Sequence, residues 1–555
     1  MALKTLYQLL LGNDPSRLRV LARQWDITLR ASRKTDMAAE LLDGMATEGA
    51  VGQILDQLTP EQRDALDDLL RKSGSLPWTV FVRRWGEVRA LGAGRLEREE
   101  LWHDPQSPAE ALWFLGLVQR AFTEDPAHPV EMAFVPEELM LYMPPPPAVS
   151  IPPPEEVPAP ARSTTHQDML ADDLVTLWAA LQRGDAADEQ LLSTLHHPAE
   201  IRRTFLETLS LEQGWMRPRD HTLNPDAIVR WLQSDTWTQV SSLFEAWRES
   251  CEWQDVAQIP TLRPDPVRGW PTPPPEIRNA FLEILAQCRA GAWYGVPAFT
   301  DYVKSYATDF LRPDGDYEAW APRSTVTEAP LRGFDAWDSV EGALVAYLIT
   351  GPLYWLGAVS TGGPEPDLID AFSITEMGIA WLGTPPPPDL PAPPPIVIEN
   401  DGKITVPSHR RYERFQLSRI ADLVSMSTAS GDLSSPDRTH LYSYRLSSSS
   451  LNRAKQQRIS TDRIIEFLET ATGGQQLPDH LKLAIQNGYQ QQRGARLTHV
   501  WLLKVAEPEH LNLPGVRELI KTKLTPEWVV VSDRHRDRLV TVFAEHGVLV
   551  EIEEA

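Results

Sequence analysis

The sequence predicts a mostly helical α+β protein built from several domains. Its 555 residues are enough for three to four domains of about 150 residues each. Hydrophobic residues make up 42% of the chain, which supports several cores and excludes global disorder. Proline is unusually frequent, at 48 residues, and much of the excess lies in two runs. We therefore expect folded units joined by proline-rich spacers.

The first domain, residues 1–143, is predicted to be helical. Apolar residues recur there at helical spacing, as at Leu18, Leu21 and Ala22. The run Thr-Pro-Glu-Gln that starts at Thr59 supplies a capping hydroxyl, a proline in the first turn and a glutamine at the third position, all typical of a helix N-terminus. Two further elements are expected, a helix from Pro108 capped by Ser107 and a strand over 130–135.

The two proline runs, residues 144–160 and 384–395, are predicted to be linkers. Dense proline prevents helix and sheet formation and favours a polyproline-like chain of about 3 Å per residue. The domain between the linkers, residues 161–383, is predicted to be helical and holds most of the 19 tryptophans. Such an aromatic series usually packs in a core. Base stacking is the functional alternative, although few basic residues lie among these tryptophans.

The end of the middle domain has a pattern typical of a winged helix. An apolar helix over 341–350 is followed by a strand over 371–375 and a short helix over 376–382. Winged helices are common and do not by themselves establish DNA binding. Residues 342–364 carry no charge, but glycine and proline interrupt them and acidic residues flank both sides. We expect buried helices here and no membrane span.

The last domain, residues 396–555, is predicted to be α+β. A hairpin is expected around Asp401 and Gly402, because an Asp-Gly pair favours a tight turn between strands. A β-α-β ending is expected over residues 528–552. The other predicted elements are a strand over 442–446, helices from about Ser450 and after Ser460, and a strand over 497–505.

The net charge of −24 is unevenly distributed. The last 160 residues hold 21 Lys+Arg and 20 Asp+Glu, a net charge of +1, so the first 395 residues carry a net charge of −25. Residues 403–463 are locally basic, with 11 basic against 5 acidic residues. This segment is the best electrostatic candidate for contact with phosphates or an acidic partner. The candidate nucleic-acid-binding residues are Arg410, Arg411, Arg414, Arg445, Arg453, Lys455 and Arg458.

Two other interpretations of this basic segment remain open. It forms either an ordinary solvated surface or a surface docked on the acidic N-terminal half of the chain. The acidic half, in turn, is expected to meet a protein partner or to limit non-specific affinity for DNA.

The sequence shows no catalytic signature. It lacks a phosphate-binding G-x-x-x-x-G-K-[ST] loop and a nucleophile elbow, and its histidines lack the ligand spacing of a zinc site. We therefore expect no catalytic residue, metal, cofactor or small-molecule substrate. The two cysteines, Cys251 and Cys288, are too few for a disulfide framework, and the N-terminal residues are typical of a helix and not of a signal peptide. A cytoplasmic location is expected.

Several strings in the chain resemble a known family. The C-terminal domain resembles the helicase-associated domain of bacterial XPB-type proteins, which corresponds to the region that precedes the motor in XPB helicases. The strings that carry this resemblance are residues 396–401, 442–447, 450–454, 464–468 and 477–478. Upstream strings that resemble the N-terminal and winged-helix parts of stand-alone members are residues 81–89, 102–105, 110–117, 134–139 and 351–357.

The resemblance implies work on DNA beside a helicase, without the helicase motor. Both RecA-like motor domains are missing from the sequence, and with them the known route of ATP hydrolysis. The expected function is that of a non-catalytic DNA-associated adaptor or regulator, whose partners are DNA and a helicase or other DNA-processing protein. The alternative is a protein-interaction scaffold whose winged helix is purely structural.

Overall fold

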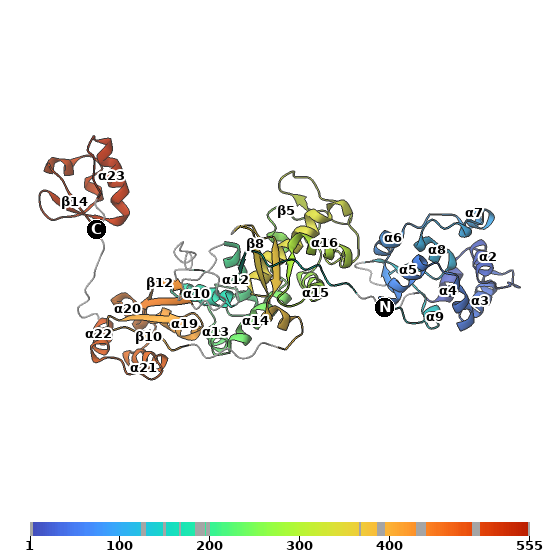
Figure 1. Cartoon of the computed structure of the whole chain (residues 1–555), viewed down its shortest axis with the longest axis horizontal. Coiled ribbons are helices and arrows are strands. Elements are labelled where there is room, and N and C mark those ends of the chain that lie inside the picture. Colours follow the sequence, from blue (N-terminus) through green and yellow to red (C-terminus); the bar gives the residue numbers. More distant parts are fainter. Residues whose placement is uncertain are drawn as a thin grey trace. The chain divides into compact units, whose positions relative to one another are not determined.

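The computed structural model describes residues 4–552 apart from 124–128, 148–150, 166–167, 184–194, 196–199, 366–367, 386–393, 429–439 and 491–499. Helices account for 50% of it and strands for 14%, so the predicted mostly helical α+β class is confirmed. The chain divides into two compact units, which are coloured along the sequence in Figure 1. The first comprises Met1–Ile398, Ile404–Arg419 and Leu423–Tyr444, and the second Glu399–Lys403, Ile420–Asp422 and Arg445–Ala555.

The N-terminal part of the first unit is a helical module with one small sheet. Its strands β1 (Ser75–Pro77), β3 (Glu131–Phe134) and β2 (Gln119–Phe122) are antiparallel, in that order. Its helices are α1 (Leu6–Gly12), α2 (Pro15–Gln24), α3 (Lys34–Met45), α4 (Glu48–Gln57), α5 (Pro60–Arg71), α6 (Trp78–Trp85), α7 (Ala93–Arg98), α8 (Pro108–Leu115) and α9 (Glu137–Met140).

The predicted starts of α5 and α8 are confirmed. Thr59 accepts a hydrogen bond from the backbone of Gln62, whose side chain bonds back to the cap, while Ser107 caps α8. The apolar faces of these helices, apart from that of α7, meet one shared core, in which Leu18, Leu41 and Leu66 are fully buried. Local capping thus sets the helix ends, and burial of the apolar faces holds the helices together.

The described residues of the first proline-rich segment form no helix and no strand beyond one isolated bridge, and they pack against the middle region. Val157 makes an isolated β-bridge to Trp293, and the hydroxyl of Tyr302 donates to the carbonyl of Pro152 at 2.8 Å. The segment is therefore held along part of its length. Most of the second spacer lies outside the described residues.

The middle region is a helical assembly with a four-stranded sheet of order β4-β8-β9-β6. Its strands are β4 (Arg162–Thr164), β5 (Leu262–Arg263), β6 (Trp293–Gly295), β7 (Arg323–Ser324), β8 (Val359–Gly363) and β9 (Ala371–Ile374). Its α-helices are α10 (Met169–Arg183), α12 (Glu200–Glu212), α13 (Pro225–Leu232), α14 (Thr236–Glu249), α15 (Pro274–Leu285), α16 (Val296–Tyr306), α17 (Ala343–Leu348) and α18 (Glu376–Trp381).

The tryptophans of this region form a core, as predicted. Trp178, Trp247 and Trp337 are fully buried. Trp178 meets Trp215 and Trp231 edge to face, with ring centroids 5.4 and 5.3 Å apart. Edge-to-face pairs place the positive ring edge on the negative ring face, so these rings stabilise the core beyond simple area burial.

The elements expected at the end of this region are present. The apolar helix is α17, extended on both sides by π-helical turns and interrupted at Gly351, and the hairpin β8–β9 and helix α18 follow it. The winged-helix assignment itself stays a prediction.

No helix among the described residues combines the length and the apolarity needed to cross a membrane.

The segment after the second spacer begins with the predicted hairpin. Strand β10 (Val397–Ile398) pairs antiparallel with β11 (Lys403–Pro407), and Gly402 in the turn has a φ of +81°. The sheet of order β10-β11-β13-β12 also contains β12 (Asp422–Thr428) and β13 (His440–Arg445), and α19 (Arg411–Ile420) lies between β11 and β12 in the sequence. Most of this segment belongs to the first unit, so residue 395 is not the boundary between the two units.

The second unit has helices followed by a three-stranded antiparallel sheet of order β14-β16-β15. The predicted helix after Ser460 is confirmed, whereas the strand predicted over 548–552 is wrong, because that segment is irregular. The edge position is taken instead by the polar strand β15, which hydrophobic alternation did not indicate. The elements are α20 (Ser448–Gln456), α21 (Thr461–Ala471), α22 (Asp479–Tyr489), β14 (Val500–Lys504), β15 (Ile520–Lys523), β16 (Trp528–Ser532) and α23 (Arg536–Glu545).

Candidate functional site

Three of the seven predicted basic residues lie at the start of α19. Arg411 and Arg414 are three positions apart, so their side chains share one face of the helix, and each side chain is only 1% exposed. Arg410 is partly exposed, pairs with Glu413 at 3.1 Å and donates to the carbonyl of Pro394 at 3.0 Å. The two buried guanidinium groups therefore belong to the interior of the first unit.

Helix α10 and the residue before it provide the carboxylates that hold Arg411. The Arg411 guanidinium bonds to Asp168 at 2.5 Å and to Asp172 at 2.8 Å, and it also donates to Gln239 of α14 at 2.8 Å. A buried arginine is tolerable only when its donors and its charge are matched in this way. We call this group of residues, together with His409 and Arg414, the α10–α19 cluster.

Arg414 contacts the carboxylate of Asp172, as Arg411 does. Its guanidinium is 3.4 Å from Asp172, donates to the hydroxyl of Thr176 at 2.7 Å and lies 3.5 Å from the ring centroid of Tyr442. This ring belongs to β13, so one arginine connects α10, α19 and the sheet. The burial of Arg411 and Arg414 removes them from any surface that a phosphate could reach in this structure. The contacts of these two arginines agree with the interpretation in which the basic segment docks on the acidic N-terminal half of the chain.

The α10–α19 cluster shifts several pKa values. Burial opposes ionisation of Asp168, but the charge of Arg411 and a hydrogen bond from His409 outweigh it and lower the pKa of Asp168. The hydrogen bond to Asp168, at 3.0 Å, raises the pKa of His409. Burial alone would lower the pKa of Arg411, yet Asp172 and Asp168 raise it. The cluster therefore favours the charged forms of Asp168, His409 and Arg411.

The other four predicted residues lie in the second unit and differ in exposure. Arg453 donates to Asp422 at 2.8 Å and is partly buried, and the exposed Arg445 donates to Asp401 at 3.0 Å. Lys455 and Arg458, at the C-terminal end of α20, are exposed, and no carboxylate pairs with either one within the described ranges. Of the seven, these two are the most available to a phosphate group.

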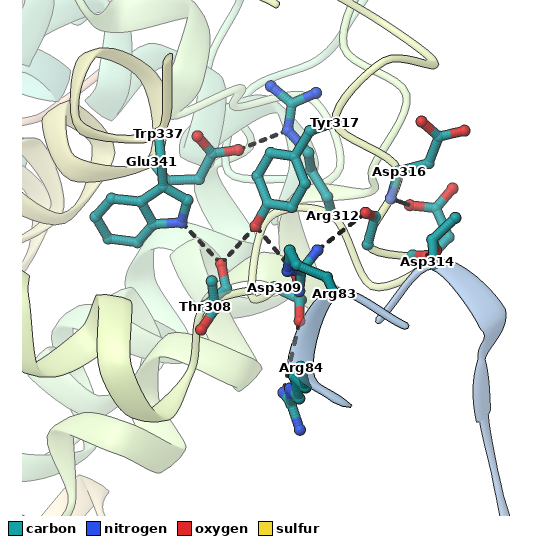
Figure 2. Close-up of polar contacts among 12 residues, drawn as sticks. Arg83, Arg84, Thr308, Asp309, Arg312, Asp314, Asp316, Tyr317, Trp337 and Glu341 are labelled. Carbon is teal, nitrogen blue, oxygen red and sulfur yellow. Dashed lines mark hydrogen bonds and ion pairs between the residues drawn. The ribbon is translucent and has the colours of Figure 1, made fainter. Parts of the chain in front are cut away.

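A second polar cluster, which the sequence analysis did not predict, joins α6 to the loop after α16 (Figure 2). Arg83 forms an ion pair with Asp309 and donates to the carbonyl of Gly315 at 3.1 Å. Arg84 lies 3.6 Å from the other carboxylate oxygen of Asp309. We call this group the α6–loop cluster. The N-terminal module therefore contacts the middle region through charged side chains.

The backbone of Gly315 explains how closely α6 approaches the loop. Gly315 has a φ of +65°, and a Cβ at this position would lie 2.3 Å from a methyl carbon of Val80. Only glycine fits both the left-handed conformation and the close packing. The sequence does indicate a turn here, because Asp314-Gly315-Asp316 has the composition of a typical turn. It does not indicate what the turn contacts, because Arg83 lies more than 230 residues upstream of Gly315.

Behind Asp309 the α6–loop cluster continues into the core (Figure 2). The Tyr317 hydroxyl lies 3.1 Å from Asp309 and 3.0 Å from the carbonyl of Thr308, which also accepts a hydrogen bond from Trp337. Arg312 pairs with Glu341 at 2.6 Å, and both side chains are 1% exposed. Burial raises the pKa of Glu341, and Arg312 opposes that rise.

In both clusters most charged side chains have a partner of opposite charge, and the contacts join elements that are far apart in the sequence. The described part of the chain contains no group of three or more potential metal ligands. Burial raises the pKa of the Cys288 thiol to about 12, so this thiol stays protonated at neutral pH.

Comparison with known proteins adds no assignment. No model of a protein family matches the chain, and no curated protein matches it.

Proposed function

We propose that this protein is a non-catalytic, cytoplasmic, DNA-associated adaptor. The observation that carries the proposal is the exposed basic end of α20, where Lys455 and Arg458 directly follow residues 450–454, a string that resembles part of the XPB helicase-associated domain. Two exposed positive side chains three positions apart, neither paired with a carboxylate within the described ranges, can each neutralise a DNA phosphate. The resemblance makes a helicase or another DNA-processing protein the expected partner.

The burial of Arg411 and Arg414 supports a second candidate, a protein-interaction scaffold. Basic side chains that the sequence offered for phosphate contact instead hold elements of the chain together. Under this alternative the whole basic segment is structural, and the full-length protein has no measurable affinity for DNA.

Salt-dependent binding distinguishes the two candidates. Full-length protein is titrated with labelled duplex, forked and single-stranded DNA at about 50 and about 200 mM salt. The double variant Lys455→Glu/Arg458→Glu removes two phosphate contacts, which reduces the slope of log affinity against log salt by about 1.8 and weakens binding at least tenfold at about 50 mM salt.

The matched control is Arg217→Glu/Arg219→Glu, which changes the charge equally at two exposed arginines of the first unit. It should leave the slope unchanged. Equal losses in both double variants would assign the effect to net charge alone. Absence of binding to all three DNAs at about 50 mM salt would favour the scaffold.

A further inference from the structure

The sheet of the second unit has one covered face and one open face. Val529 and Val531 of β16 are buried in a core with Leu539 and Phe543 of α23. Side chains alternate along a strand, so Trp528, Val530 and Ser532 are on the opposite face. We call that opposite side the open face.

Strand register shows which residues share the open face. In β14, Leu502 pairs with Val530 and Lys504 pairs with Trp528, and directly paired residues of antiparallel strands are on the same side. In β15, Thr522 pairs with Val530. Leu524 follows β15 by one residue, and its N–H donates to the carbonyl of Trp528 at 2.9 Å. Alternation therefore places Leu524 beside Trp528 on the open face.

The open face is apolar and accessible. Leu502 is 56% exposed and Leu524 57% exposed, and Val530 and Trp528 lie between them in the central strand. None of these four side chains belongs to the core beneath the sheet. Val530 and Trp528 are half-buried, so the two leucines provide most of the exposed apolar area, and exposed apolar area of this kind is costly in water and typical of an interaction site.

The charge of the three strands specifies the partner further. Lys504 is exposed and lies on the open face, because it pairs with Trp528, and β14, β15 and β16 contain no aspartate or glutamate. The Lys504 ammonium lies 5.6 Å from the Trp528 ring centroid, at the edge of the apolar group. An apolar centre with a lysine at its edge is complementary to an apolar stripe flanked by carboxylates.

The dimensions fit one helix. Three strands about 4.8 Å apart make a surface about 10 Å wide, which is about the diameter of an α-helix with its side chains. Nucleic-acid bases bind by stacking on aromatic rings. The open face has a single ring, Trp528, among leucine and valine, which pack into the ridges of a helix.

We propose that the open face of the β14–β16–β15 sheet is a docking surface for an acidic amphipathic helix of a partner protein. The partner helix lays leucine-like side chains across Leu502, Val530 and Leu524, and a carboxylate beside its apolar stripe meets Lys504. This surface is separate from the exposed basic end of α20, so it gives the proposed adaptor a protein-binding site in addition to its DNA contact.

The test uses full-length protein and a labelled synthetic helical peptide with leucine on one face and glutamate on the other. Fluorescence anisotropy should show binding, and Leu502→Asn should weaken it about tenfold by placing an amide in the apolar centre. Leu483→Asn, at a leucine of α22 that is 57% exposed, is the matched control and should change affinity less than twofold. Melting curves of both variants report on folding.

Charge reversal gives a second readout that keeps the apolar centre intact. Lys504→Glu should weaken binding of the glutamate peptide and strengthen binding of the same peptide with lysine in place of glutamate. Equal affinity of a scrambled glutamate peptide, or no change with both Leu502→Asn and Lys504→Glu, would overturn the proposal. Loss of oligothymidine binding in Leu502→Asn, with peptide binding intact, would instead identify a nucleic-acid surface.

Discussion

The α6–loop cluster and the α10–α19 cluster join the same kinds of side chain at different depths. In the first, the side chain of Arg83 is 23% exposed and that of Asp309 12% exposed. In the second, Arg411 is 1% exposed and Asp172 is 2% exposed. Water and salt screen charges near a surface and reach buried charges poorly. An arginine–aspartate ion pair is therefore sensitive to salt in the α6–loop cluster, whereas in the α10–α19 cluster it is a fixed part of the core.

The difference in exposure also explains how many polar partners each arginine has in the two clusters. Taking an arginine and an aspartate out of water costs several kcal/mol per ion, which must be offset by matched hydrogen bonds and charges. Arg411 accordingly meets two aspartates and a glutamine, and Arg414 meets a carboxylate, a hydroxyl and a ring. Arg83, with partial access to water, has one carboxylate and one carbonyl together with the ring of Tyr317.

The largest expected effect comes from breaking the buried cluster. Asp172→Ala leaves Arg411 and Arg414 with too few acceptors, so we expect the free energy of unfolding of the middle region to fall by about 3–5 kcal/mol. Urea unfolding followed by tryptophan fluorescence measures it, because most tryptophans lie in this region. Asp172→Asn, which keeps the shape and one acceptor, should lose less.

The control for this comparison is Glu283→Ala, at an exposed position of α15. It should change the free energy of unfolding by no more than about 0.5 kcal/mol. A loss below about 1 kcal/mol in Asp172→Ala would mean that the buried arginines find other partners, and the contrast between the two clusters would disappear.

A smaller effect is expected at the α6–loop cluster. Arg83→Ala removes an ion pair and a hydrogen bond at a partly exposed site, which costs about 1 kcal/mol. Hydrogen exchange of the loop over 309–317 should rise about fivefold, because local opening becomes easier. Arg95→Ala, which breaks the exposed Arg95–Glu99 pair of the same module, is the control and should leave this loop unchanged.

Salt sharpens the same comparison. Raising the salt from about 50 to about 500 mM in the wild-type protein should increase exchange of the 309–317 loop and leave α19 unaffected. A uniform response of both segments would indicate that exposure does not separate the two clusters.

The sequence predicted the elements whose signals are local. The sequence identified Thr59 and Ser107 as helix caps because a capping hydroxyl acts within three residues. The burial of Arg411 could not be predicted in the same way, since its partner Asp172 is 239 residues away. Charge counting detected a basic segment, but it could not tell which arginines face inward. Strand β15 was missed for a related reason, since its Ile-Lys-Thr-Lys sequence has little apolar alternation.

The smallest expected effect is a pH dependence at the edge of the α10–α19 cluster. The pKa of His409 is raised by its hydrogen bond to Asp168, and Asp172 and Arg411 are the other charges that face it. A raised pKa means that the folded protein binds this proton more tightly than the unfolded chain does. The resulting stabilisation is complete below the unfolded pKa of about 6.5 and disappears as the pH rises through the higher folded value.

His409→Asn should therefore lower the free energy of unfolding by about 1 kcal/mol at about pH 5.5 and by much less at about pH 8.5. His221→Asn is the control, because His221 is exposed and has a φ of 53°, a conformation that asparagine tolerates well. The pKa of Asp168 is lowered, so its own contribution persists over this whole range and is lost only in stronger acid. An equal loss at both pH values would show that His409 acts by packing and not by its charge.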